Sequence, residues 1–84
     1  MSEREGTQVR GDVNTYFQDG MWHSRIQGEG QPFSSSPRQE RAIEAGRERA
    51  QRDKVEHIVR NMNGLISERK SFRGDVREGQ RLTG

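Results

Sequence analysis

The fold is decided by residues 36–53, which read SPRQERAIEAGRERAQRD and carry the clearest local signal in the chain. Ser36 can cap a helix, Pro37 suits the first helical turn, and Gln39 completes a capping box. We therefore expect a helix that starts at this cap and runs to about Asp53.

Small residues form the apolar face of this expected helix. They are Ala42, Ile43, Gly46 and Ala50, with Ala45 at the margin. A glycine in the middle of a helix costs roughly 1 kcal/mol relative to alanine. Gly46 therefore predicts that the helix approaches a neighbouring sheet closely.

A β-hairpin is predicted before the helix. Residues 13–18 and 21–27 both alternate between the two faces of a strand, with Trp22 and Ile26 on one face. Asp19-Gly20 stands between them and is a strong two-residue turn signal, because glycine tolerates positive φ.

A second hairpin is predicted after the helix, over residues 55–61 and 65–72, with Asn63-Gly64 as its turn. Between the first hairpin and the helix, residues 31–35 can add a short strand that carries Phe33. Proline at position 32 has no N–H to donate, so this strand suits a sheet edge.

Together these elements predict an α+β domain with the order β-β-(β)-α-β-β. One small antiparallel sheet of two hairpins packs on the helix through Trp22, Ile26 and Phe33. We expect residues 12–73 to be this single domain. Residues 1–11 and 74–84 are polar, contain glycine and lack periodicity, so we expect disordered tails.

Composition limits what so small a domain can do. The chain has 84 residues, 26% of them hydrophobic and 33% charged, so its core must be thin, and dimerisation is one way to bury more apolar surface. It has no Cys and only two His, so we expect no disulfide and no metal site. No nucleophile–base set and no deep pocket is predicted, so we expect no enzyme, no cofactor and no small-molecule substrate.

The charge is mildly basic. The formal net charge is +2, and 13 of the 15 basic residues are Arg, whose planar fork suits phosphate and carboxylate. A GC-rich genome would also favour Arg over Lys. No apolar stretch approaches the length of a membrane span and no signal peptide is recognisable, so we expect no membrane association and a cytoplasmic location.

Eight basic residues are candidates for contacting nucleic acid. They are Arg25, Arg38, Arg41, Arg49, Arg52, Arg69, Lys70 and Arg73. One group lies along the helix, one on a strand face beside Met21 and His23, and one leads into a tail with Arg77 and Arg81. For each group the alternative interpretation is an ordinary solvated surface.

Three motifs resemble a family of small bacterial proteins known as the domain of unknown function numbered twenty-one eighty-eight. They are Asp19-Gly20-Met21-Trp22, Ala42-Ile43-Glu44-Ala45-Gly46-Arg47, and Asn63-Gly64-Leu65-Ile66. The resemblance extends over about residues 19–73, and Ser71-Phe72 fits the end of the last strand. The chain departs from the family pattern at Arg60-Asn61-Met62. The resemblance implies the fold and no established activity.

Two functions remain as hypotheses. The first is a non-enzymatic, nucleic-acid-binding module of a bacterium or phage that contacts phosphates through Arg and reads few bases, for DNA or RNA. The second is a protein-interaction or assembly module, such as a homodimer, that uses an exposed sheet face or edge.

Overall fold

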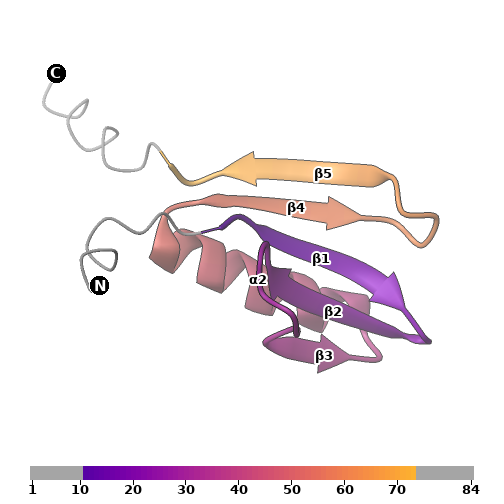
Figure 1. Cartoon of the computed structure of the whole chain (residues 1–84). Helices are drawn as coiled ribbons and strands as arrows, with labels where there is room; N and C mark the ends of the chain where they lie inside the picture. The colour runs from indigo at the N-terminus through magenta and orange to yellow at the C-terminus, as the bar shows by residue number, and fades with distance from the viewer. Residues whose placement is uncertain (1–10, 74–84) are drawn as a thin grey trace, which may run out of the picture.

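The computed structural model describes residues 11–73, and within this range one sheet of five strands carries one α-helix on one of its faces (Figure 1). The elements are β1 (Val13–Gln18), β2 (Met21–Ile26), β3 (Ser34–Ser36), α2 (Gln39–Asp53), β4 (Glu56–Arg60) and β5 (Ile66–Ser71). The predicted disorder of the tails concerns residues that, apart from Gly11, lie outside this described range.

The strand order in the sheet is β3-β2-β1-β4-β5. The α+β class and the order of elements along the chain are confirmed. However, β1 and β4 pair in parallel, with Val13 beside His57, so the sheet is mixed and not antiparallel throughout as expected. The reason is the crossover: α2 carries the chain back across the sheet, so β4 runs in the same direction as β3 and therefore as β1.

Both hairpins form where the sequence predicts them. Asp19 and Gly20 have φ angles of 52° and 79° and make a two-residue turn, with Gln18 paired to Met21. The second turn is longer than two residues. There the N–H of Gly64 donates to the carbonyl of Asn61 at 2.9 Å.

The helix ends at the expected residue but begins later than expected. Its N-cap is Arg38, and no side chain caps it, so the predicted capping box is wrong. Ser36 belongs to β3 and pairs with Trp22, which keeps its backbone in the sheet; its hydroxyl instead accepts from the N–H of Arg38 at 3.0 Å. At the other end, Lys54 adopts the left-handed conformation that terminates α2.

The core lies between α2 and the sheet and is small. Its buried apolar cluster consists of Val13, Ala50, Val55 and Phe72, with Ile26 packed against it. Trp22 is buried as expected. Phe33 is not in the core: it is 38% exposed, and its ring packs against the guanidinium of Arg49.

A chain of polar groups crosses the centre of this interface. The Ser24 hydroxyl donates to the carbonyl of Ala42 at 2.7 Å. Its only proton is used there, so Thr15 must donate to Ser24 across 2.7 Å. Thr15 Oγ1 in turn accepts from Nε2 of His57 at 2.8 Å, which places the proton of the neutral imidazole on Nε2.

Gly46 lies directly above this polar chain, which confirms the close approach predicted from the sequence. A Cβ atom at this position would lie 2.5 Å from Nε2 of His57, 2.7 Å from Oγ1 of Thr15 and 3.0 Å from Oγ of Ser24. The helix therefore rests on three hydrogen-bonded side chains with no space for a methyl group.

Protonation of His57 should destabilise the fold. Burial lowers the pKa of His57 below its usual 6.5; Glu68 opposes this shift and Arg47 adds to it. Below about pH 6.5 the unfolded chain binds a proton that the folded chain does not bind. We expect the free energy of unfolding to be level above that pH and to fall below it. Its slope should approach, at most, about 1.4 kcal/mol per pH unit, the value for one proton.

Urea denaturation at several pH values between 5 and 8 measures this slope, since most carboxylates titrate lower, near pH 4. A His23→Gln variant is the matched control, because His23 lies on the other face of the sheet and the variant should keep the same slope. A stability that is flat down to pH 5 in the wild type would show that His57 is not held neutral.

Candidate functional site on the uncovered sheet face

The face of the sheet opposite α2 has no helix over it among the described residues, and Figure 1 shows this face toward the viewer with α2 behind it. We call it the open face. Strand alternation turns to it the side chains that do not meet the helix. From β1, β2 and β4 these are Asn14, Tyr16, Gln18, Met21, His23, Arg25, Glu56, Ile58 and Arg60.

An aromatic and cationic row lies across β1 and β2 on the open face. Tyr16 pairs directly with His23, and their ring centroids are 5.3 Å apart. The Arg25 guanidinium carbon lies 5.7 Å from the Tyr16 ring centroid, and Arg25 Nη1 donates to the carbonyl of Glu29 at 3.0 Å. His23 Nδ1 is 2.7 Å from the hydroxyl of Ser35, which holds the ring in place. These contacts fix the orientation of all three side chains before any ligand binds.

A shallow recess of about 530 Å³ lies beside this row. Its lining includes Asn14, Tyr16, Arg25, Ile58 and Arg60. It therefore offers an aromatic ring, a side-chain amide and two guanidinium groups around an apolar floor. This combination suits a planar ring attached to an anionic group, because the ring can stack while the guanidinium groups hold the charge.

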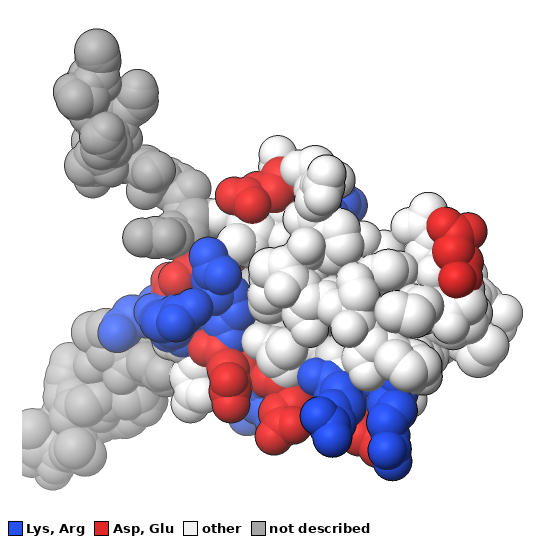
Figure 2. Space-filling view, turned by 90° about the horizontal axis from the view of Figure 1, so that it is seen from below, with Lys and Arg blue, Asp and Glu red and all other residues white. Residues whose placement is uncertain are grey.

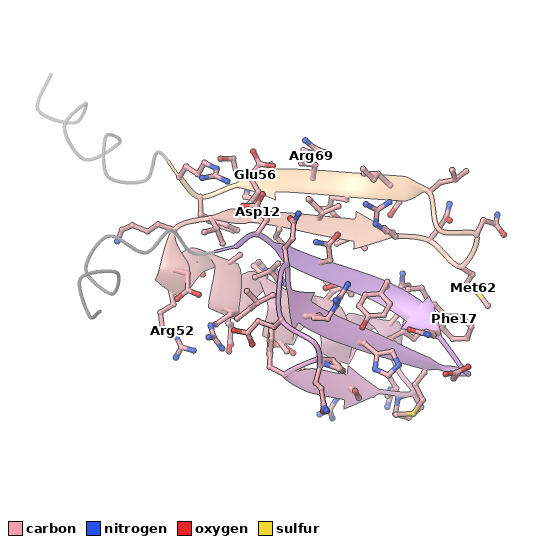
Figure 3. The ribbon with its side chains drawn as sticks, viewed as in Figure 1. Asp12, Phe17, Arg52, Glu56, Met62 and Arg69 are labelled. Carbon is pink, nitrogen blue, oxygen red and sulfur yellow. The ribbon has the colours of Figure 1, made fainter. Side chains whose placement is uncertain are left out.

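Arg69 and Arg73 are engaged with the carboxylates of Glu56 and Asp12. Figure 3 labels Arg69, Glu56 and Asp12. Arg73 donates to Asp12 at 2.6 Å and lies 3.8 Å from Glu56. Arg69 lies 3.7 Å from the other oxygen of Glu56. Arg69 is on the open face because it pairs with Ile58. Lys70 pairs with His57 and so faces the opposite side, with its Nζ 5.8 Å from the centre of the Phe72 ring.

The helix arginines lie on the far side of the sheet and are interspersed with carboxylates. Arg38 lies 3.6 Å from Glu40, and Arg49 donates to Asp53 at 3.1 Å. Viewed from the β3 edge, Figure 2 shows blue and red side chains side by side and no continuous blue stripe.

The two remaining helix arginines of the predicted set are also on this side. Arg41 lines a groove of about 480 Å³ between β3 and α2 together with Glu44 and Glu48. Arg52 is exposed near the end of α2 and points away from the sheet in Figure 3. The eight predicted residues are therefore distributed over both faces of the sheet and do not form one strip.

Tyr16 and Arg60 lie on the open face but are absent from the predicted set. The signal for Tyr16 was present, because a two-residue turn at Asp19-Gly20 pairs position 16 with position 23 and places a tyrosine beside His23. Arg60 had no comparable signal, because its place beside β1 depends on the parallel pairing of β4.

Within residues 11–73, no group of three or more His, Cys, Asp or Glu side chains is arranged to hold a metal ion. The same residues contain no helix long and apolar enough to cross a membrane.

The family described as "Uncharacterized protein conserved in bacteria (DUF2188)" matches residues 13–72, which include every strand and the helix. The chain belongs to the DUF2188 family. The match confirms the resemblance that the sequence motifs suggested. No curated protein and no solved structure gave a significant match. The open face of this DUF2188 domain must therefore be interpreted from its own chemistry.

Proposed function

We propose that this DUF2188 domain is a non-enzymatic binding module, acting in the bacterial cytoplasm, that holds single-stranded nucleic acid on its open face. The observation that carries the proposal is the fixed row of Tyr16, His23 and Arg25 on an uncovered sheet. Sheets that present aromatic and Arg side chains in this way bind single strands by stacking on the bases and pairing with the phosphates.

The positive charges on the open face support contact with a short stretch of phosphate backbone. Arg25 and Arg60 border the recess, whereas Arg69, on the same face, is already paired with Glu56 at 3.7 Å. The two guanidinium groups at the recess match two successive phosphates. The helix side is a weaker candidate for a phosphate backbone, because Glu44 and Glu48 lie beside Arg41 and would repel it.

The non-enzymatic part of the proposal rests on the buried nucleophilic groups and not on the exposed Ser35 and His23, whose contact belongs to the row on the open face. The Thr15 and Ser24 hydroxyls and the His57 imidazole form the hydrogen-bonded chain under α2. All three residues are buried, and each donates its proton within that chain. A substrate cannot reach these groups, so they stabilise the interface and are not expected to attack a bond.

The salt dependence of binding tests the proposal. A fluorescein-labelled single-stranded RNA or DNA of roughly 12 nucleotides is titrated at about 50 and 200 mM salt, with a duplex as the competitor. Each phosphate contact contributes a slope of about −0.7 for single strands, so two contacts predict a slope of about −1.4. The affinity should fall by roughly sevenfold over this range.

The salt slope also distinguishes binding on the open face from binding along the helix. Contacts from all eight originally predicted basic residues would give a slope of about −5 or steeper. Preference for the duplex would favour the helix arginines. No binding to any of the probes at about 50 mM salt would exclude nucleic acid as the ligand.

A further inference from the structure

We propose that two copies of this chain join edge to edge through antiparallel pairing of their β5 strands, forming one continuous ten-stranded sheet. This interface is separate from the open-face ligand and does not depend on it. β5 lies at the edge of the sheet and, among the described residues, pairs with β4 alone.

Within residues 11–73, nothing covers the outer edge of β5, which is six residues long. All six of its residues are exposed, and α2 contacts the other four strands but not this one. The opposite edge of the sheet is β3, which is only three residues long. An exposed strand of six residues carries free backbone N–H and C=O groups that can pair with another strand.

The backbone groups that face outward can be identified from the pairing with β4. The N–H of Phe72 donates to the carbonyl of Val55, so this antiparallel pair is hydrogen-bonded. Hydrogen-bonded and non-bonded pairs alternate along a ladder. The Glu56–Ser71 and Ile58–Arg69 pairs are therefore non-bonded, and the N–H and C=O groups of Arg69 and Ser71 point to the outer edge.

The charge order of β5 is complementary to itself in one register. If a two-fold axis passes between the Arg69 residues of two copies, Glu68 of each copy lies opposite Lys70 of the other. Glu68 has no ion pair within the described residues that would have to be broken first. The two Arg69 side chains meet near the axis, where each retains Glu56 as its own counter-ion at 3.7 Å.

Neighbouring registers are disfavoured. An axis at Glu68 places two carboxylates opposite each other, and an axis at Lys70 does the same with two ammonium groups. Of the registers with the axis at Glu68, Arg69 or Lys70, the one at Arg69 is therefore the one in which opposite charges meet.

Exposed apolar side chains near β5 are a second reason to expect the interface at this edge. The turn that leads into β5 and the first residue of β5 leave Met62 65%, Leu65 64% and Ile66 44% exposed. In the dimer, the Ile66 end of one β5 meets the Ser71 end of the other. Such contact would cover apolar surface that the thin core of one copy leaves in water.

A charge-swap series tests the interface on the full chain. Sedimentation equilibrium over a concentration series gives the dimer dissociation constant for the wild type, E68K, K70E and the double variant E68K/K70E. Each single change places like charges opposite one another twice, and we expect the dissociation constant to rise about tenfold or more. The double variant exchanges both partners and should return close to the wild-type value.

Hydrogen exchange on the wild type gives an independent measurement. The amides of Arg69 and Ser71 should become protected only as the protein concentration rises, whereas those of Glu68 and Lys70 are bonded to β4 at any concentration. A monomer at all concentrations would overturn the proposal. A dimer that the single swaps do not weaken would also overturn it, because the contact would then lie elsewhere.

Discussion

Gly46→Ala should destabilise this domain by about 1–5 kcal/mol, although alanine is the better helix former. The new methyl group would lie within 3.0 Å of three side-chain atoms, those of His57, Thr15 and Ser24. All three atoms belong to buried hydrogen bonds. Moving them leaves a polar group unsatisfied, at about 1–3 kcal/mol, and overpacking adds about 1–3 kcal/mol. The gain in helix propensity offsets only about 1 kcal/mol of this cost.

Chemical denaturation monitored by circular dichroism measures this loss. Gln51→Ala is the matched control, because it also introduces alanine into α2 but at an exposed position, and it should change stability by no more than about 0.5 kcal/mol. If Gly46→Ala were as stable as the wild type, α2 could not lie as close to the sheet as described here. A domain of this size has roughly 5–15 kcal/mol in total, so the expected loss is a large part of its stability.

Tyr16→Ala should weaken the binding of single-stranded nucleic acid by roughly 5- to 150-fold. Stacking of one base on an aromatic side chain contributes about 1–3 kcal/mol, and the fold-change follows from that range. Tyr16 is also the ring against which His23 and Arg25 are held, so its removal loosens both neighbours. Tyr16→Phe keeps the ring and should bind within about twofold of the wild type.

Arg41→Gln is the control that distinguishes the expected effect of Tyr16→Ala from a general dependence of binding on positive charge. Arg41 belongs to α2, on the other side of the sheet from Tyr16, and its loss should alter single-strand affinity only slightly. Anisotropy titrations of the three variants under one salt condition provide the comparison. If Arg41→Gln reduced binding and Tyr16→Ala did not, the ligand would lie along the helix, and the open-face proposal would be wrong.

Local signals in the sequence were enough to predict both hairpins and the end of the helix. The turn at Asp19-Gly20 depends mainly on two positive φ angles, and both residues have them. The helix is predicted from its apolar periodicity, and Lys54 follows its last residue in the structure. The close approach of α2 to the sheet could also be predicted, because a glycine within a helix, here Gly46, indicates close packing. The start of the helix was misplaced, since a Ser-Pro pair does not reveal that Ser36 is already bonded within a strand.

The parts that could not be predicted depend on contacts between distant residues. Nothing local in residues 13–18 indicates a parallel partner more than forty positions away. Thr15, Ser24 and His57 each come from a different strand, and each alone looks like a polar residue at a core position. Only the assembled sheet brings them under one glycine. The same applies to Arg60, which joins the open face through β4.

The contact between Asp12 and Arg73 has a consequence for how this domain can be joined to other polypeptides. Arg73 Nη2 lies 2.6 Å from Asp12 Oδ1, so the chain enters and leaves the fold at neighbouring points. A domain whose entry and exit are adjacent can be inserted into a surface loop of a host protein without forcing the ends of that loop apart. The turns at Asp19-Gly20 and Asn61–Gly64 would then project from the far end of the insert, away from the host.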